Sequence, residues 1–225
     1  MTRGALATME ERAVRVARGQ ITLDGDLTLP PHPRAVVLFA HGSGSSRFSS
    51  RNKSVAAVLQ ERGFATLLID LLTPNEESID VHTAEYRFDI GRLADRLIGA
   101  AAWLETEPAT AKLPVALFGA STGGGAALVA AAEIPERIAA VVSRGGRPDL
   151  AGEALARVRA PTLLIVGGND EVVLELNRAA LAQLRGTARL EVIPGATHLF
   201  EEAGALEEVA RHAAAWIETY AARAS

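Results

Sequence analysis

Short apolar runs alternate with longer segments whose apolar residues recur at helical spacing along most of this chain. Brief runs rich in Val, Ile and Leu are typical of buried strands, and a period of about 3.6 residues is typical of amphipathic helices. The pattern predicts strands at residues 13–18, 20–29, 35–40, 65–69, 115–118, 138–143, 162–166 and 189–193. It predicts helices at residues 52–62, 86–104, 122–132, 150–156, 174–184 and 205–221. This alternation predicts an α/β fold with a mostly parallel sheet of about eight strands and helices on both faces.

The beginning of the chain departs from the alternation, because its two strands follow each other directly and are expected to be antiparallel. Asp24-Gly25 lies inside the second strand and predicts a tight hairpin turn or a bulge there. We expect residues 1–12 to be a flexible tail on a single domain that spans residues 1–225.

Composition narrows the classes of function. The chain has 225 residues, of which 48% are hydrophobic and 22% charged, as expected for one well-cored globular domain. The net charge is −4 with both signs interspersed, so we expect neither a nucleic-acid partner nor a membrane partner. The absence of cysteine excludes disulfides and a thiolate nucleophile and fits a cytoplasmic protein. Charges interrupt residues 1–19 before any apolar run of signal-peptide length.

The segment 113–123 carries the strongest chemical signal, because it joins an apolar strand, the turn Gly119-Ala-Ser121-Thr122-Gly123 and a helix of small residues in that order. A serine on such a sharp turn adopts a strained backbone and projects its hydroxyl above the sheet. Glycines two residues to either side let the strand and the helix approach each other. Ser121 is therefore a candidate nucleophile.

An acid and an imidazole follow Ser121, each in a loop just after a predicted strand. A serine hydroxyl needs an imidazole to accept its proton and a carboxylate to orient that imidazole. Asp170 and His198 supply these groups in the order Ser, Asp, His. In a parallel sheet these loops lie at the same edge, so the three side chains are expected to converge.

Other residues compete for these roles. Asp170 also fits a helix N-cap, and Glu171 beside it is an alternative acid. His41 is expected to hold its own loop in place rather than to react. The remaining histidines are expected to be solvated and are His32, His82 and His212.

With these motifs the chain resembles the α/β-hydrolases over residues 13–221, and its compactness resembles the dienelactone hydrolase-like branch. The resemblance implies an α/β-hydrolase fold in which Ser121 is the nucleophile, Asp170 the acid and His198 the base. It also implies an oxyanion hole made by the backbone N–H groups of Thr122 and Ser43, with no metal or organic cofactor. Dienelactone hydrolases carry a cysteine nucleophile, so the serine here leaves the substrate open while keeping acyl transfer.

Two other classes of function remain as alternatives. Gly42-Ser43-Gly44 follows a buried strand and precedes a helix, and the next strand ends at Asp70, as in a dinucleotide-binding unit. Arg47 stands where the third glycine of that fingerprint belongs, and Asp70 is more simply explained as a strand terminator that fixes the following loop. The other alternative is a hydrolase-fold binding protein without activity, although such relatives usually lose a member of the triad.

The predicted loops indicate a small site. Only residues 144–160 separate two strands at the place where lipolytic hydrolases insert a lid, so no large lid domain is expected. The loop 71–85, with Glu76 and Glu77, is expected to form a second wall. We therefore expect a small or short-chain ester as substrate and a monomeric or homodimeric enzyme.

Arginines gather near the predicted mouth of the site. The structural interpretation is that they pair with carboxylates on a solvated face. The sharper hypothesis is that Arg144, together with Arg51 or Arg87, holds a carboxylate or another anionic group of the substrate, because a guanidinium binds such groups in a bidentate manner. The arginines concerned are Arg47, Arg51, Arg87, Arg144 and Arg147.

Overall fold

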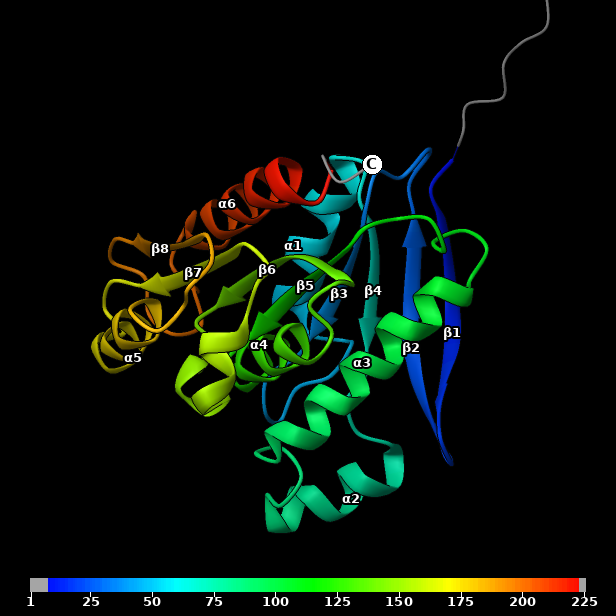
Figure 1. Cartoon of the computed structure of the whole chain (residues 1–225), viewed down its shortest axis with the longest axis horizontal. Coiled ribbons are helices and arrows are strands. Elements are labelled where there is room, and N and C mark those ends of the chain that lie inside the picture. Colours follow the sequence, from blue (N-terminus) through cyan, green and yellow to red (C-terminus); the bar gives the residue numbers. More distant parts are fainter. Residues whose placement is uncertain (1–7, 223–225) are drawn as a thin grey trace, which may run out of the picture.

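A twisted sheet of eight strands runs through the centre of the molecule, and the computed structural model describes residues 8–222 (Figure 1). The strand order is β1-β2-β4-β3-β5-β6-β7-β8. β2 is antiparallel to both of its neighbours, and all the other pairs are parallel. The predicted α/β-hydrolase class is therefore confirmed. The strands are β1 (Glu10–Arg18), β2 (Ile21–Leu29), β3 (Val36–Ala40), β4 (Ala65–Ile69), β5 (Val115–Ala120), β6 (Ile138–Arg144), β7 (Thr162–Gly167) and β8 (Ala188–Ile193).

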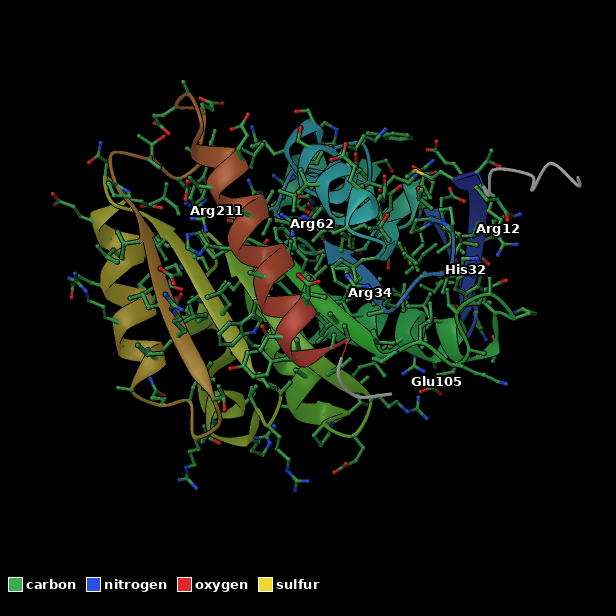
Figure 2. All side chains as sticks on the ribbon, turned by 90° about the horizontal axis from the view of Figure 1, so that it is seen from above. Arg12, His32, Arg34, Arg62, Glu105 and Arg211 are labelled. Carbon is green, nitrogen blue, oxygen red and sulfur yellow. The ribbon has the colours of Figure 1, made fainter. Side chains whose placement is uncertain are left out.

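Helices cover both faces of this sheet (Figure 1). One face carries α1 (Ser50–Glu61) and α6 (Ala205–Tyr220). The other carries α3 (Ile90–Thr106), α4 (Thr122–Glu133), the 3-10 segment η1 (Pro148–Arg157) and α5 (Glu171–Leu181). Figure 2 shows α6 crossing the sheet, with Arg34 beside it; Arg34 Nη2 lies 3.1 Å from Glu218 Oε1 on that helix.

The central strands are buried on both faces, because the side chains of each strand pack alternately into two separate cores. In β3, Val36 and Leu38 contact the core under α3 and α4, whereas Val37 and Phe39 contact the core under α1 and α6. Phe39 packs on Phe118 of β5 with ring centroids 4.9 Å apart. Each such side chain contributes about 1.5–3 kcal/mol by burial. This packing fixes the strand ends from which the site is built.

The beginning of the chain differs from the prediction in two respects. β1 starts at Glu10, inside the segment expected to be a tail, and residues 1–7 of that segment lie outside the described residues. Gly25 forms no turn, because it pairs with Val14 of β1 and with Ile69 of β4. The hairpin turn lies earlier, at Gly19 in the left-handed region with φ of 59°.

The expected loop 71–85 contains a helix, α2 (Pro74–Thr83), which lies beyond the end of β4 (Figure 1). Thr73 and Glu76 form a capping box at its start, with Thr73 Oγ1 accepting from the Glu76 N–H at 3.2 Å. Asp80 is the buried residue of α2. Its carboxylate accepts hydrogen bonds from the N–H of Tyr86 at 2.7 Å and from the N–H of Arg87 at 3.0 Å. α2 is thus attached to the molecule mainly by polar contacts.

Candidate active site

The turn between β5 and α4 holds Ser121 in a strained conformation, with φ of 51° and ψ of −122°. A Cβ atom at position 119 would lie 2.4 Å from the carbonyl oxygen of Gly123, and one at position 123 would lie 2.3 Å from that of Ala40. Only glycine fits at these two positions. The Ser121 carbonyl accepts from the N–H of Arg147 at 3.0 Å, which helps to hold the turn. The turn predicted from the sequence is therefore present, with the nucleophile candidate at its apex.

His198 lies between Asp170 and Ser121. Its Nδ1 lies 2.6 Å from Asp170 Oδ2, and its Nε2 lies 3.4 Å from Ser121 Oγ. Asp170 is at the N-cap position of α5 but makes no side-chain cap hydrogen bond, so its carboxylate is used for the histidine. Glu171 is exposed on the first turn of α5. The geometry therefore favours Asp170 over Glu171 as the acid.

The loop after β3 lies directly against this turn. A Cβ atom on Gly42 would be 3.0 Å from the Cβ atom of Ser121. Within residues 8–222, the backbone N–H groups of Ser43 and Thr122 have no protein acceptor. The N–H of Thr122 is unpaired because it opens a helix, where the first N–H groups lack partners in the preceding turn. These are the two N–H groups that the resemblance implies for an oxyanion hole.

His41 fixes this loop rather than lining the chemistry. Its Nε2 accepts the N–H of Leu71 at 2.9 Å, and its Nδ1 lies 3.0 Å from the carbonyl oxygen of Gly42, so the ring is a neutral tautomer protonated on Nδ1. Burial lowers the pKa of His41. Asp70 accepts the N–H of Arg47 at 2.7 Å and also pairs with its guanidinium. The structural roles predicted for His41 and Asp70 are confirmed.

A cavity of about 230 Å³ opens in front of Ser121 and His198. It is also lined by Arg51 and Asn52 at the start of α1 and by Arg144 at the end of β6. Of segment 144–160, only Arg144 lines the cavity, in agreement with the absence of a large lid. The other lining residues are Gly42, Ser43, Ser45, Ser49, Ala120 and Leu199.

Arg144 is buried with 7% of its surface exposed, yet the described part of the chain offers no carboxylate within 4.0 Å of its guanidinium. Its Nε and Nη1 atoms have no partner, and Nη2 lies 3.4 Å from Asn52 Oδ1. Burial lowers the pKa of Arg144 to about 10, and the positive charge of Arg51 adds to this effect. At neutral pH the side chain is still a cation.

Asn52 was not singled out from the sequence. Its signal is helical spacing, because Asn52 lies on the same face of α1 as the buried residues Val55, Ala56 and Leu59. A polar residue at a core position of an otherwise apolar helix face indicates a specific hydrogen-bonding role.

The remaining arginines at the mouth are already paired. Arg87 was expected at the cavity but lies outside it, because its Nε binds Asp80 Oδ2 at 2.6 Å. Arg147 binds Asp149 at 2.7 Å. Arg47 pairs with Asp70, as described above. These three arginines therefore pair with carboxylates of the protein, whereas Arg144 pairs with none among residues 8–222.

The acidic residues of α2 also differ from the expectation. Glu76 accepts hydrogen bonds from Arg92 and Arg96 at 2.8 Å each and so braces α2 against α3. Glu77 lines a neighbouring groove of about 500 Å³ rather than the cavity at Ser121. Glu76 therefore takes no part in the expected second wall, whereas Glu77, with Leu72, also lines a small pocket shared with Ser43 and Thr122.

Residues 8–222 offer neither a metal cluster nor a membrane-spanning helix. No group of three His, Cys, Asp or Glu side chains in this range is arranged to hold a metal ion. None of the helices described there has the length and apolar character needed to cross a membrane.

Comparison with known proteins gives two kinds of match. Residues 23–222 match the family model described as "Dienelactone hydrolase family". Two proteins of Mycobacterium tuberculosis, from strains CDC 1551 and H37Rv and each named "Putative phosphoribosyl transferase", are 59% identical over 208 residues. This match covers 92% of the chain and 46% of each relative, so the chain spans about half the length of these curated relatives.

Solved structures give the same fold. A crystal structure of a dienelactone hydrolase from Anabaena variabilis has a TM-score of 0.93 and 60% identity, covering 95% of this chain and 99% of that chain. Est1E from Butyrivibrio proteoclasticus has a TM-score of 0.77 at 18% identity, covering 92% of this chain and 98% of its own. At that identity the second likeness concerns the fold alone.

Proposed function

This chain belongs to the dienelactone hydrolase family, and from that premise we propose that it is a serine hydrolase that cleaves small carboxylic esters. The observation that carries the proposal is the position of His198, with one ring nitrogen 2.6 Å from Asp170 and the other 3.4 Å from Ser121. This is the order of contacts by which an imidazole, oriented by a carboxylate, can accept the proton of the serine.

In the proposed reaction, Ser121 Oγ attacks the ester carbonyl while its proton passes to His198 Nε2. The N–H groups of Ser43 and Thr122 bind the oxyanion, and one such donor is worth about 3 kcal/mol in the transition state. The alcohol leaves with the proton from Nε2, and an acyl group remains on Ser121. Water then gives its proton to His198 and attacks the acyl group, which releases the acid and restores the serine.

The size of the cavity supports a small substrate. At about 230 Å³ it is below the range of about 300–1,000 Å³ usual for drug-sized ligands. Arg51, Asn52 and Arg144 line it with polar groups, which do not suit a long acyl chain. A serine nucleophile, where the resemblance implies cysteine, leaves open whether a dienelactone is among the substrates of this chain.

The name of the mycobacterial relatives raises another activity, phosphoribosyl transfer. Those proteins are about twice as long as the matched segment, and this chain is similar to only one part of each. Their name describes the whole protein. The residues that converge in this chain support acyl transfer instead. A binding protein without activity is the remaining alternative, and labelling separates it from an enzyme.

Labelling with a fluorophosphonate probe tests the proposal, because the probe reacts only with an activated serine. Peptide mapping is expected to find the label on Ser121 and none on the Ser121→Ala variant. Ser54→Ala is a matched control, since Ser54 is an exposed residue of α1 whose hydroxyl donates only to the Ser50 carbonyl. A series of p-nitrophenyl esters is expected to show fastest release for the shortest acyl chains. Full activity of Ser121→Ala would overturn the proposal.

A further inference from the structure

Arg144, which lines the cavity at Ser121, is a buried cation whose hydrogen-bonding capacity is largely unused. Its Nε and Nη1 atoms have no partner, and the contact of Nη2 with Asn52 Oδ1 is long at 3.4 Å. Its guanidinium lies over the ring of Phe200, 5.8 Å from the centroid, so apolar surface takes the place of water on that side. A buried charge without a counter-charge is strongly unfavourable, and such groups are concentrated at binding sites.

Arg51 is a second cation that lines the same cavity. Its nearest acidic partner, Glu201 Oε1, is 3.7 Å away, and the Glu201 side chain is 67% exposed to solvent. A screened ion pair of this kind compensates little charge. The first turn of α1, which carries Arg51 and Asn52, has no acidic residue to offset the positive end of the helix dipole. The part of the cavity that Arg51, Asn52 and Arg144 line is therefore positive.

The two positive charges of Arg51 and Arg144 determine which anionic group fits best. A carboxylate would neutralise one of the two guanidinium groups and would offer two acceptor oxygens. A phosphate monoester carries about two negative charges at neutral pH and three acceptor oxygens. It can therefore neutralise Arg144 and Arg51 together.

We propose that Arg51 and Arg144, together with the start of α1, form a subsite for a dianionic phosphate group carried by the ester substrate. This proposal rests on the proposed hydrolysis at Ser121, since the same cavity holds both. The phosphate is not the bond that is cleaved. It anchors the substrate so that a carboxylic ester a few bonds away reaches Ser121.

Turnover of three matched acetate esters tests the subsite: acetylglycerol, acetylglycerol phosphate and O-acetylglycolate. They are neutral, dianionic and singly charged. In the unmodified chain, kcat/KM for acetylglycerol phosphate is expected to exceed that for acetylglycerol by about 10- to 100-fold, as for hydrogen bonds to charged groups. O-acetylglycolate should lie between them. Arg144→Gln and Arg51→Gln should each lower the ratio of the phosphorylated to the neutral ester.

Arg159→Gln is the matched control, because that side chain is 72% exposed and pairs with Glu136 away from the cavity. Its ratio should equal that of the unmodified chain. If the buried Arg144→Gln variant fails to fold, the one-third exposed Arg51 still provides the comparison. Equal rates for the phosphorylated and neutral esters would overturn the subsite, and a preference for O-acetylglycolate would overturn the assignment to a dianion.

Binding separates this proposal from the proposed function. Inorganic phosphate should raise the melting temperature of the Ser121→Ala variant more than chloride does at equal ionic strength, since a ligand that binds the folded state stabilises it. Arg144→Gln should remove the difference. If phosphate binds but no ester is cleaved and no fluorophosphonate label appears, the hydrolase proposal fails and the subsite stands. If the label appears but phosphate gives no more stabilisation than chloride, the subsite fails and the hydrolase proposal stands.

Discussion

Asp170 Oδ2 lies 2.6 Å from Nδ1 of His198, the ring nitrogen that faces away from Ser121. A carboxylate can only accept a hydrogen bond, so Nδ1 must carry the proton. In the neutral ring Nε2 is then unprotonated and available to the serine hydroxyl. The contact between Asp170 and His198 therefore sets the tautomer on which the proposed chemistry depends.

Asp170→Asn should lower kcat by about 10,000-fold on p-nitrophenyl acetate, because an amide can donate to Nδ1 and so stabilise the wrong tautomer. Glu171→Gln is the matched control, since Glu171 is the exposed neighbour on α5. It should leave kcat nearly unchanged and shift the free energy of unfolding by no more than about 0.5 kcal/mol. The reverse outcome would make Glu171 the acid.

Gly42→Ala should impair catalysis more than stability. The added Cβ would lie 3.0 Å from the Cβ atom of Ser121 and 3.1 Å from the carbonyl oxygen of Ala120, so the oxyanion loop must move away from the nucleophile. A displacement of about 1 Å near the chemistry costs about 100-fold in rate, whereas overpacking costs about 1–3 kcal/mol in unfolding free energy. Ester turnover and urea unfolding measure the two effects.

Gly91→Ala is the control for this substitution, because in the first turn of α3 the nearest atom to the new Cβ is Asp89 Oδ1 at 3.6 Å. It should keep full activity and gain up to about 1 kcal/mol in stability from helix propensity. Full activity of Gly42→Ala would show that the loop does not contribute to the oxyanion site.

The stability of the protein should fall as the pH drops below about 6.5, the ordinary pKa of histidine, through the titration of His41. Burial lowers the pKa of His41 in the folded state, although the carboxylates of Asp70 and Glu77 partly oppose this. The unfolded chain therefore binds a proton that the folded chain does not, and the free energy of unfolding rises with pH in this window.

Urea unfolding at about pH 5.5 and about pH 7.5 measures this dependence. His41→Gln should reduce the difference between the two values, whereas His82→Gln, at an exposed position of α2, should retain it. An unchanged difference in His41→Gln would assign the dependence to other groups.

Asp80→Asn should loosen α2 without unfolding the rest of the chain. Burial alone would raise the pKa of Asp80, but hydrogen bonds from Arg87 and Tyr86 outweigh it and hold the pKa below its ordinary value. The stabilisation is complete above about pH 3.9 and is lost as the pH falls through the lowered pKa of the folded state. Removal of the charge should cost about 1–3 kcal/mol.

Hydrogen exchange measures this loosening, because amides of residues 74–83 should exchange faster in Asp80→Asn while those of β3 and β5 keep their protection. Asp89→Asn is the control. Its pair with Arg92 is exposed, and asparagine also caps a helix well, so exchange in α2 should not change. Uniformly faster exchange in Asp80→Asn would mean that α2 is part of the main cooperative unit.

The features that the sequence predicted correctly depend on short-range patterns. The central strands are uninterrupted apolar runs because both of their faces are covered, as in β3 and β5. The turn at Ser121 is visible from Gly119 and Gly123, since a side chain at either position would overlap backbone atoms. The convergence of Asp170 and His198 on Ser121 follows from the parallel arrangement of the strands that precede them.

What the sequence did not predict depends on polar partners distant in the chain. α2 lacks an apolar stripe, because its buried residue is the acid Asp80, and only the Thr73 capping box marks its start. Arg87 looked available for a substrate because its partner is set by how α2 folds back. Asn52 acquires its neighbour Arg144 only when the fold brings the start of α1 to the end of β6.

The polar attachment of α2 also bears on how the protein can diverge. Because hydrogen bonds and ion pairs hold this segment beside the loop after β3, and neither core depends on it, its length and sequence are free to drift while the scaffold persists. A different segment in place of α2 would therefore reshape the surface beside Ser43 and Thr122 while both cores persist.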